Sequence, residues 1–151
     1  RRRSRRCRIM KYLLDTSAVS ELVRPKPETR VVRWIDERDE SSIFLSVLTI
    51  GELHNGIALL PIGPRKNRLQ NWVDGELARR FQGRVLDVNL DVAAEWGRLK
   101  ARADTRGAPV PVIDSLIAST AIVHNLTVVT RNIKDFTRCG VAVYDPWTVN
   151  S

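Results

Sequence analysis

Four carboxylic acids stand at positions from which they could act together: Asp15, Glu52, Asp114 and Asp135. Asp15 directly follows a short apolar run, and Asp135 comes shortly after another. Glu52 and Asp114 lie beside the apolar positions of helical patterns, where a partly buried carboxylate must be paired, hydrogen-bonded or bound to a metal. Converging carboxylates repel one another, and a hard divalent cation such as Mg²⁺ relieves that repulsion. Such a site supports phosphodiester hydrolysis, in which the metal orients the phosphate and lowers the pKa of a bound water.

Each of these acids also has a simpler structural interpretation. Asp15 is a candidate N-cap for the helix that follows it, and Glu52 is a candidate solvated residue on the flank of its helix. Asp114 would complement the helix dipole in the first turn after Pro111, and Asp135 would cap a short turn. Taken singly, these interpretations compete with a catalytic role. The set of four acids and their order favour a shared site.

Short apolar runs alternate with helical patterns around these acids. Strands are expected over residues 12–14, 42–47, 85–88, 126–129 and 142–144. Helices are expected over residues 16–23, 49–60, 69–81, 92 to about 107 and 111–124, and a further helix is expected to start at residue 29. This alternation predicts an α/β fold, a single domain with a parallel central sheet flanked by helices. Ligands bind beyond the carboxyl ends of such strands, so we expect Asp15, Asn132 and Asp135 on the same rim.

Local signals place two of the helices more closely. Thr29 is the expected N-cap of the second helix. In the helix over 49–60, Ile50, Leu53, Ile57 and Leu60 recur at steps of three, four and three, which puts them on one face. Glu52 stands directly beside this apolar face.

The 151 residues fit one domain, and their net charge of +8 is unevenly distributed. Residues 1–9 contain six Arg and no acid, so the remainder carries only +2, which does not by itself argue for nucleic acid binding. Met10 is the single Met and opens a strand, so it is the expected translation start. We therefore expect residues 1–9 to be a basic tail outside the fold and residues 10–151 to form the domain. The alternative is a basic arm that binds RNA or DNA.

Other classes of site leave no trace in the sequence. Two Cys, Cys7 and Cys139, make no disulfide framework, which favours a reducing cytoplasm. No apolar run approaches the roughly 20 residues of a membrane span, so no membrane association is expected. A Gly-rich phosphate loop, a G-x-S-x-G elbow and paired Cys/His zinc spacing are all missing.

Four segments together resemble the motifs of PIN domains in order and spacing. They are LLDTSAVSEL (Leu13–Leu22), TIGELHNGI (Thr49–Ile57), PVIDSLIASTA (Pro111–Ala121) and VVTRNIKDF (Val128–Phe136). The pattern is similar to that of VapC-type and FitB-type toxins and extends over about residues 10–147, nearly the whole chain. One such motif is weak evidence, whereas four in order, each on the expected kind of element, are strong.

The resemblance implies a Mg²⁺ or Mn²⁺ site at the carboxyl rim of the sheet. Asp15, Glu52 and Asp114 match its three central acids, with Asp15 and Asp114 as direct metal ligands. Glu52 would help to bind the metal or orient the attacking water. Thr16 and Ser17 would hold the first carboxylate or a metal-bound water.

The fourth motif departs from the pattern of many relatives. They carry Asp where this chain has Asn132, whose amide can supply an oxygen ligand but no charge. Asp135, three residues on, would supply the missing charge, and Thr130 would line the same pocket. This departure concerns the occupancy of a second metal and leaves the expected fold unchanged.

The resemblance implies a divalent-metal-dependent endoribonuclease, the toxin component of a VapBC-type toxin–antitoxin pair. The implied partner is a VapB-like or FitA-like antitoxin whose C-terminal tail fills the acidic groove with a basic side chain facing the carboxylates. A homodimer is expected, and DNA binding only through the antitoxin.

Two alternatives remain at this point. A catalytically weak PIN domain would act as a binding module in an antitoxin–DNA complex, and Asn132 favours it. A phosphatase or receiver-like domain would use Asp15 as a phosphoryl acceptor. A phosphatase of this kind would place a second Asp two residues later, and this chain has Ser17 there.

Overall fold

Five short strands form one parallel sheet in the computed structural model, which describes residues 9–148. The strands are β1 (Tyr12–Leu14), β2 (Ile43–Ser46), β3 (Val85–Leu86), β4 (Thr127–Val129) and β5 (Val143–Tyr144). Their order across the sheet is β3-β2-β1-β4-β5, and every neighbouring pair is parallel. This sheet confirms the predicted α/β architecture. The predicted basic tail lies outside the described residues except for Ile9.

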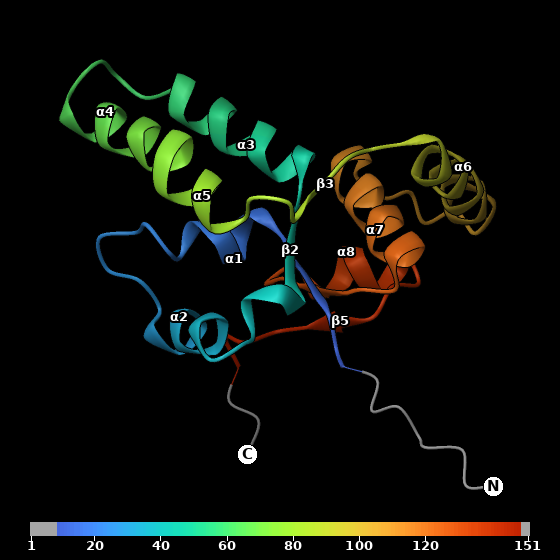
Figure 1. Cartoon of the computed structure of the whole chain (residues 1–151). Coiled ribbons are helices and arrows are strands. Elements are labelled where there is room, and N and C mark those ends of the chain that lie inside the picture. The colour runs from blue at the N-terminus through green and yellow to red at the C-terminus, as the bar shows by residue number, and fades with distance from the viewer. Residues whose placement is uncertain (1–8, 149–151) are drawn as a thin grey trace, which may run out of the picture.

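Helices connect these strands and cover both faces of the sheet (Figure 1). They are α1 (Thr16–Ser20), α2 (Thr29–Asp36), α3 (Val47–Ala58), α4 (Pro64–Asn71), α5 (Ala78–Arg80), α6 (Leu90–Thr105), α7 (Val112–His124) and α8 (Ile133–Arg138), with a 3₁₀ turn η1 (Glu40–Ser42) and a π-helical segment η2 (Trp72–Leu77). No helix within residues 9–148 is long and apolar enough to cross a membrane.

The alternation of side chains along the strands divides the core into two halves. Leu13 and Val128 pack with α6, α7 and α8 on one face, whereas the next residues, Leu14 and Val129, pack with α1 and α2 on the other. All four side chains are fully buried. Burial of each such side chain contributes roughly 1.5–3 kcal/mol, so both faces of the central strands hold the sheet in place.

Several helix starts differ from those predicted. The helix expected over 69–81 begins at Pro64, the first residue of α4. The α3 helix begins at Val47 rather than near 49 because the hydroxyl of Ser46 accepts a hydrogen bond from the backbone N–H of Leu48 at 3.0 Å and caps it. Thr29 is the first residue of α2 and not its N-cap, which is Glu28 without a side-chain cap. Capping depends on the backbone angle of one residue, and residue type alone does not determine that angle.

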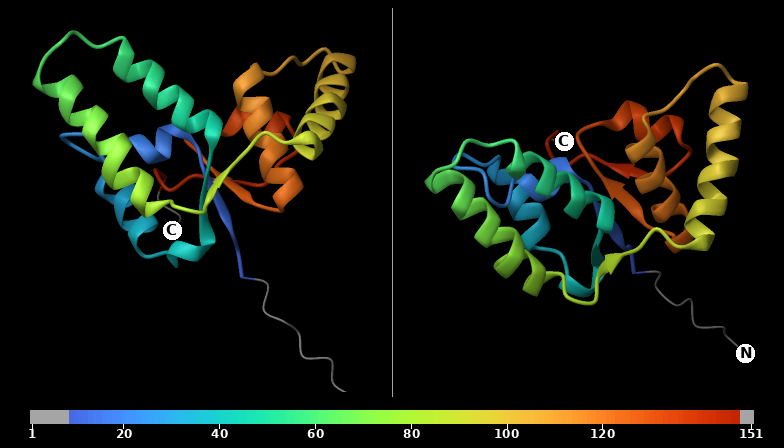
Figure 2. Two further views of the ribbon diagram at one scale, coloured as in Figure 1. Left: turned by 45° about the horizontal axis from the view of Figure 1, so that its top comes forward. Right: turned by 90° about the horizontal axis from the view of Figure 1, so that it is seen from above.

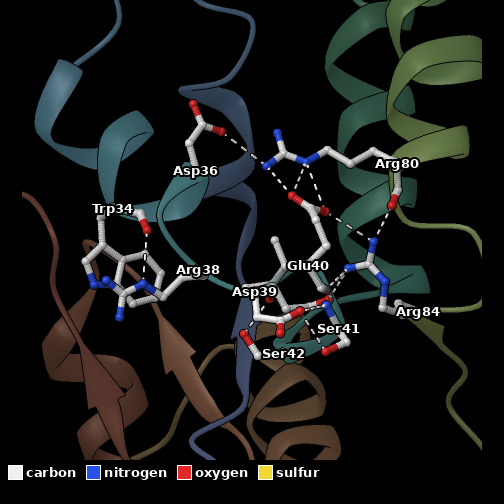
Figure 3. Close-up of polar contacts among 10 residues, drawn as sticks. Trp34, Asp36, Arg38, Asp39, Glu40, Ser41, Ser42, Arg80 and Arg84 are labelled. Carbon is white, nitrogen blue, oxygen red and sulfur yellow. Dashed lines mark hydrogen bonds and ion pairs between the residues drawn. The ribbon is translucent and has the colours of Figure 1, made fainter.

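Helices α3 and α4–η2–α5 form a hairpin, the helical arm (residues 47–80), that projects beyond the sheet (Figure 2). Charged contacts hold its base (Figure 3). Arg80 lies 3.2 Å from Asp36 and 2.8 Å from Glu40, which also pairs with Arg84 at 3.2 Å. The guanidinium of Arg84 additionally donates to the backbone carbonyl of Ile43 at 2.6 Å. The bonds of Arg80 tie the arm to α2 and η1, and those of Arg84 tie the segment after the arm to η1 and β2.

Candidate metal-dependent active site

The strand order creates a switch point between β1 and β4. The chain runs outward from β1 through β2 to β3 and then returns to build β4 and β5 on the other side of β1. In open parallel sheets, ligands bind outside the carboxyl ends of the strands at such a point. Asp15 follows β1 and Thr130 follows β4, and the backbone N–H of Asp15 donates to the carbonyl of Val129 at 3.1 Å.

Asp15 is the buried acid of the site, with 7% of its surface exposed. Oδ1 accepts hydrogen bonds from the Ser17 hydroxyl at 2.6 Å and from the Ala18 backbone N–H at 3.1 Å. Oδ2 accepts one from the Thr130 hydroxyl at 2.5 Å. Burial raises the pKa of Asp15, and these hydrogen bonds oppose the rise. The residue is also the N-cap of α1, so the simpler interpretation of Asp15 holds beside its place in the site.

Glu52 reaches the site from the helical arm. It is exposed on α3, so the expectation of a partly buried carboxylate is wrong for Glu52. The hydroxyl of Thr16 donates a hydrogen bond of 2.5 Å to Glu52 Oε1. The side chain that immediately follows Asp15 therefore holds the second acid, and α1 links the two.

Asp114 and Asp135 meet across the amide of Asn132. The Asn132 amide nitrogen donates to Asp114 Oδ2 at 3.2 Å and to Asp135 Oδ2 at 2.8 Å. Half-buried Asp114 has a pKa of about 6, raised first by burial and then by the charges of Asp135, Asp15 and Glu52. The charge of Asp114 therefore interacts with those of all three other acids, which come from three separate segments of the chain.

Asn132 lies between two of the acids. Its amide nitrogen donates a hydrogen bond to each carboxylate, and its expected role as an oxygen ligand to a metal stays a prediction. Two neighbouring carboxylates need a donor between them when no cation is there. The backbone N–H of Asn132 donates a hydrogen bond to the Thr130 hydroxyl at 2.9 Å, and this bond connects the pair Asp114 and Asp135 to Asp15.

The donor set fits a hard divalent cation held by few protein ligands. Within the described residues, no group of three or more His, Cys, Asp or Glu is close enough to hold a metal ion by itself. Mg²⁺, however, usually takes one or two carboxylates and completes its shell with water and substrate phosphate. Burial and the charges of three other acids raise the pKa of Asp114, and a bound cation would favour its charged form.

A groove of about 330 Å³ opens beside the acids, between α1 and the helical arm. Thr16, Glu52 and Trp72 are among its lining residues, together with three arginines: Arg24, Arg65 and Arg68. The sequence alone did not predict this groove. The available signal was the acid-free run PRKNRLQN, with arginines three residues apart.

Residues 12–141 match the family described as PIN domain. The chain belongs to the PIN-domain family. It is 40% identical over 135 residues to toxin FitB of Neisseria gonorrhoeae, a match that covers 89% of this chain and 97% of the relative. It is 36% identical over 135 residues to VapC ribonuclease Y4jK of Sinorhizobium fredii, covering 89% and 96%. The tRNA(fMet)-specific endonuclease VapC of Salmonella typhimurium is 30% identical over 138 residues, covering 91% and 98%.

Solved structures of PIN-domain toxins share the fold. The structure of FitAB bound to a DNA fragment matches with a TM-score of 0.87 at 37% identity and covers 93% of this chain and 98% of that chain. DNA-bound VapBC from Salmonella typhimurium matches with a TM-score of 0.77 at 28% identity, covering 93% and 100%. The predicted family and fold are therefore confirmed, and a receiver-like phosphatase is excluded.

Proposed function

We propose that this PIN domain is a divalent-metal-dependent endoribonuclease and the toxin component of a VapBC-type pair. One observation carries the proposal: four acids from separate segments gather at the switch point of a parallel sheet, where burial and the charges of the other three acids raise the pKa of Asp114 to about 6. Relatives that the chain matches over nearly its whole length are named ribonuclease or endonuclease, which supports RNA as the substrate.

Asp15 and Asp114 would hold the cation, Mg²⁺ or Mn²⁺. When bound, the ion polarises the phosphate and lowers the pKa of a coordinated water. Ser17 and Thr130 keep the carboxylate of Asp15 in one orientation through bonds of 2.6 and 2.5 Å. A residue fixed in this way presents its oxygens without having to reorganise during the reaction.

Glu52 would orient the attacking water and accept its proton. The hydroxyl of Thr16 holds its exposed carboxylate by a hydrogen bond, so the carboxylate is both oriented and accessible to water. Asn132 keeps Asp114 and Asp135 together, and Asp135 adds the fourth negative charge toward a cation. Hydrolysis by water needs no covalent nucleophile from the chain.

The partner that we propose is a VapB-like or FitA-like antitoxin. Solved relatives are antitoxin–toxin complexes, among them FitAB and VapBC on DNA. A basic side chain from the antitoxin tail would neutralise the acids and block the cation. DNA would be bound through the antitoxin, and the homodimer stays a prediction.

Cleavage of a mixed RNA substrate tests this function directly. The full chain is incubated with Mg²⁺, Mn²⁺ or EDTA beside the variants Asp15→Ala and Asp114→Asn. Asp87→Asn serves as the control because Asp87 is exposed and makes no side-chain hydrogen bond or ion pair with another described residue. We expect metal-dependent cleavage by wild type and Asp87→Asn only. Equal activity in all four proteins would show that the cleavage is not due to these acids and that the domain acts by binding.

A further inference from the structure

The groove beside the acids continues along the helical arm. A second, more open hollow lies next to it, and both are lined by Arg24, Arg68 and Trp72. The first hollow begins at Glu52, and the second extends to Arg79. The two hollows therefore form one track that leads from Glu52 along α4 and η2.

Three arginines of this track carry charge that no acid neutralises. Arg65, Arg68 and Arg79, the groove arginines, are exposed and form no salt bridge with any acid in residues 9–148. Arg24, in contrast, is paired with buried Glu21 at 2.7 Å. Besides Glu52 at the end of the track, Glu76 is the one acid among its lining residues. The track is thus basic on balance.

The last groove arginine, Arg79, lies against the π-helical segment. A π-helical turn is rare and is frequently found at functional sites. Gly75 lies within it, and a Cβ there would come 3.3 Å from Nη1 of Arg79, so the guanidinium lies against the bare backbone. Leu77, buried in the same segment, packs in the core with α1 and α2, and Trp72 forms part of the wall of the track.

We propose that the groove arginines bind the phosphates of the RNA strand on one side of the bond to be cut. This proposal rests on the proposed ribonuclease function. The carboxylates themselves attract no phosphate, so unpaired positive charges beside them would add binding energy for RNA, and arginine is suited to phosphate. From Arg65 to Arg79 the helix rises about 21 Å, which is long enough for several nucleotides. Apolar walls beside unpaired cations suit the bases of a single strand.

The salt dependence of RNA binding tests this assignment. Binding of a fluorescent RNA oligonucleotide is followed by anisotropy in EDTA, which prevents metal-dependent cleavage, over a range of salt concentrations. Each phosphate contact to a single strand contributes about 0.7 to the slope of log affinity against log salt. Arg65→Ala, Arg68→Ala and Arg79→Ala should each lower the slope by about 0.7 and weaken binding. The control is Arg33→Ala on α2, which is exposed and lines neither hollow.

The outcomes separate this proposal from the proposed function. Slopes equal to wild type in all three variants would overturn the RNA track, even if metal-dependent cleavage is present. Reduced slopes in a protein that does not cleave RNA would support the track and refute the nuclease. A polyglutamate peptide of the same length is titrated in parallel. If the variants lose affinity for this peptide and not for RNA, the groove receives an acidic protein segment and the RNA track is wrong.

Discussion

Asp114→Asn should stabilise the metal-free protein while abolishing its activity. The carboxylate of Asp114 is half-buried among three other acids, and its pKa stands at about 6 against an ordinary value of 3.8. Between these two values the unfolded chain has released the proton that the native state retains. The free energy of unfolding of wild type should therefore fall as pH rises from about 4 to 6, and Asn, which is never charged, removes this loss.

The size of the effect follows from the shift. A difference of about 2 pKa units corresponds to about 3 kcal/mol if the charge were fully buried. Asp114 is half-exposed, and solvent screening reduces this to about 1–2 kcal/mol. Its position in the first turn of α7 opposes the gain, because a negative charge there is worth about 0.3–1 kcal/mol. The net expectation is about 1 kcal/mol in favour of Asn at neutral pH in EDTA.

Urea unfolding in EDTA at several pH values measures the difference. The free energy of unfolding of Asp114→Asn minus that of wild type should be near zero or negative at pH 4, increase up to about pH 6 and then stay constant. Asp87→Asn should show no such trend. Mg²⁺ should stabilise wild type and leave the variant unchanged, since only the native wild-type site binds the ion. A variant that is less stable than wild type at neutral pH would refute the reasoning from charge repulsion.

Three further changes test other contacts. Thr130→Val removes the hydroxyl that donates to buried Asp15, so cleavage should fall about tenfold or more while circular dichroism still reports a folded protein. Asn132→Asp replaces the donor between two carboxylates by another acid; scanning fluorimetry should show a lower unfolding temperature in EDTA and a larger gain with Mg²⁺ than in wild type. Glu40→Gln removes the negative charge that pairs with both Arg80 and Arg84. Urea titration should therefore show a loss of about 1 kcal/mol in the free energy of unfolding, and the loss should be smaller in high salt.

Local patterns in the sequence were sufficient to predict the elements and the rim of the sheet. The apolar runs before Asp15 and before Thr130 predict β1 and β4 because parallel strands are buried on both faces. The recurrence of apolar residues in α3 and α7 predicts these helices and puts Glu52 and Asp114 beside their inner faces. Such signals lie within a few residues of the feature that they predict.

Features that depend on contacts between distant segments could not be predicted in the same way. The pairing of β1 with β4 is not encoded in either strand alone. The orientation of the Asn132 amide depends on the two carboxylates that accept its hydrogen bonds. The exposure of Glu52 depends on how the helical arm is placed. The groove arginines were missed because their importance lies in facing the same hollow as Glu52, which no linear spacing reveals. The π turn at Trp72 has no reliable sequence signature.

The hydrogen bond between Asp15 and Thr130 joins residues 115 positions apart, and this has a consequence for synthesis of the protein. At about 5–20 residues per second, a ribosome needs roughly 6–23 s between making one partner and making the other. During that interval β1 has no β4 beside it, and Asp15 lacks the hydroxyl that fixes its carboxylate. A chain interrupted before residue 130 would therefore carry three of the acids without an assembled centre, so the nuclease that we propose could not cut RNA until its own translation was almost finished.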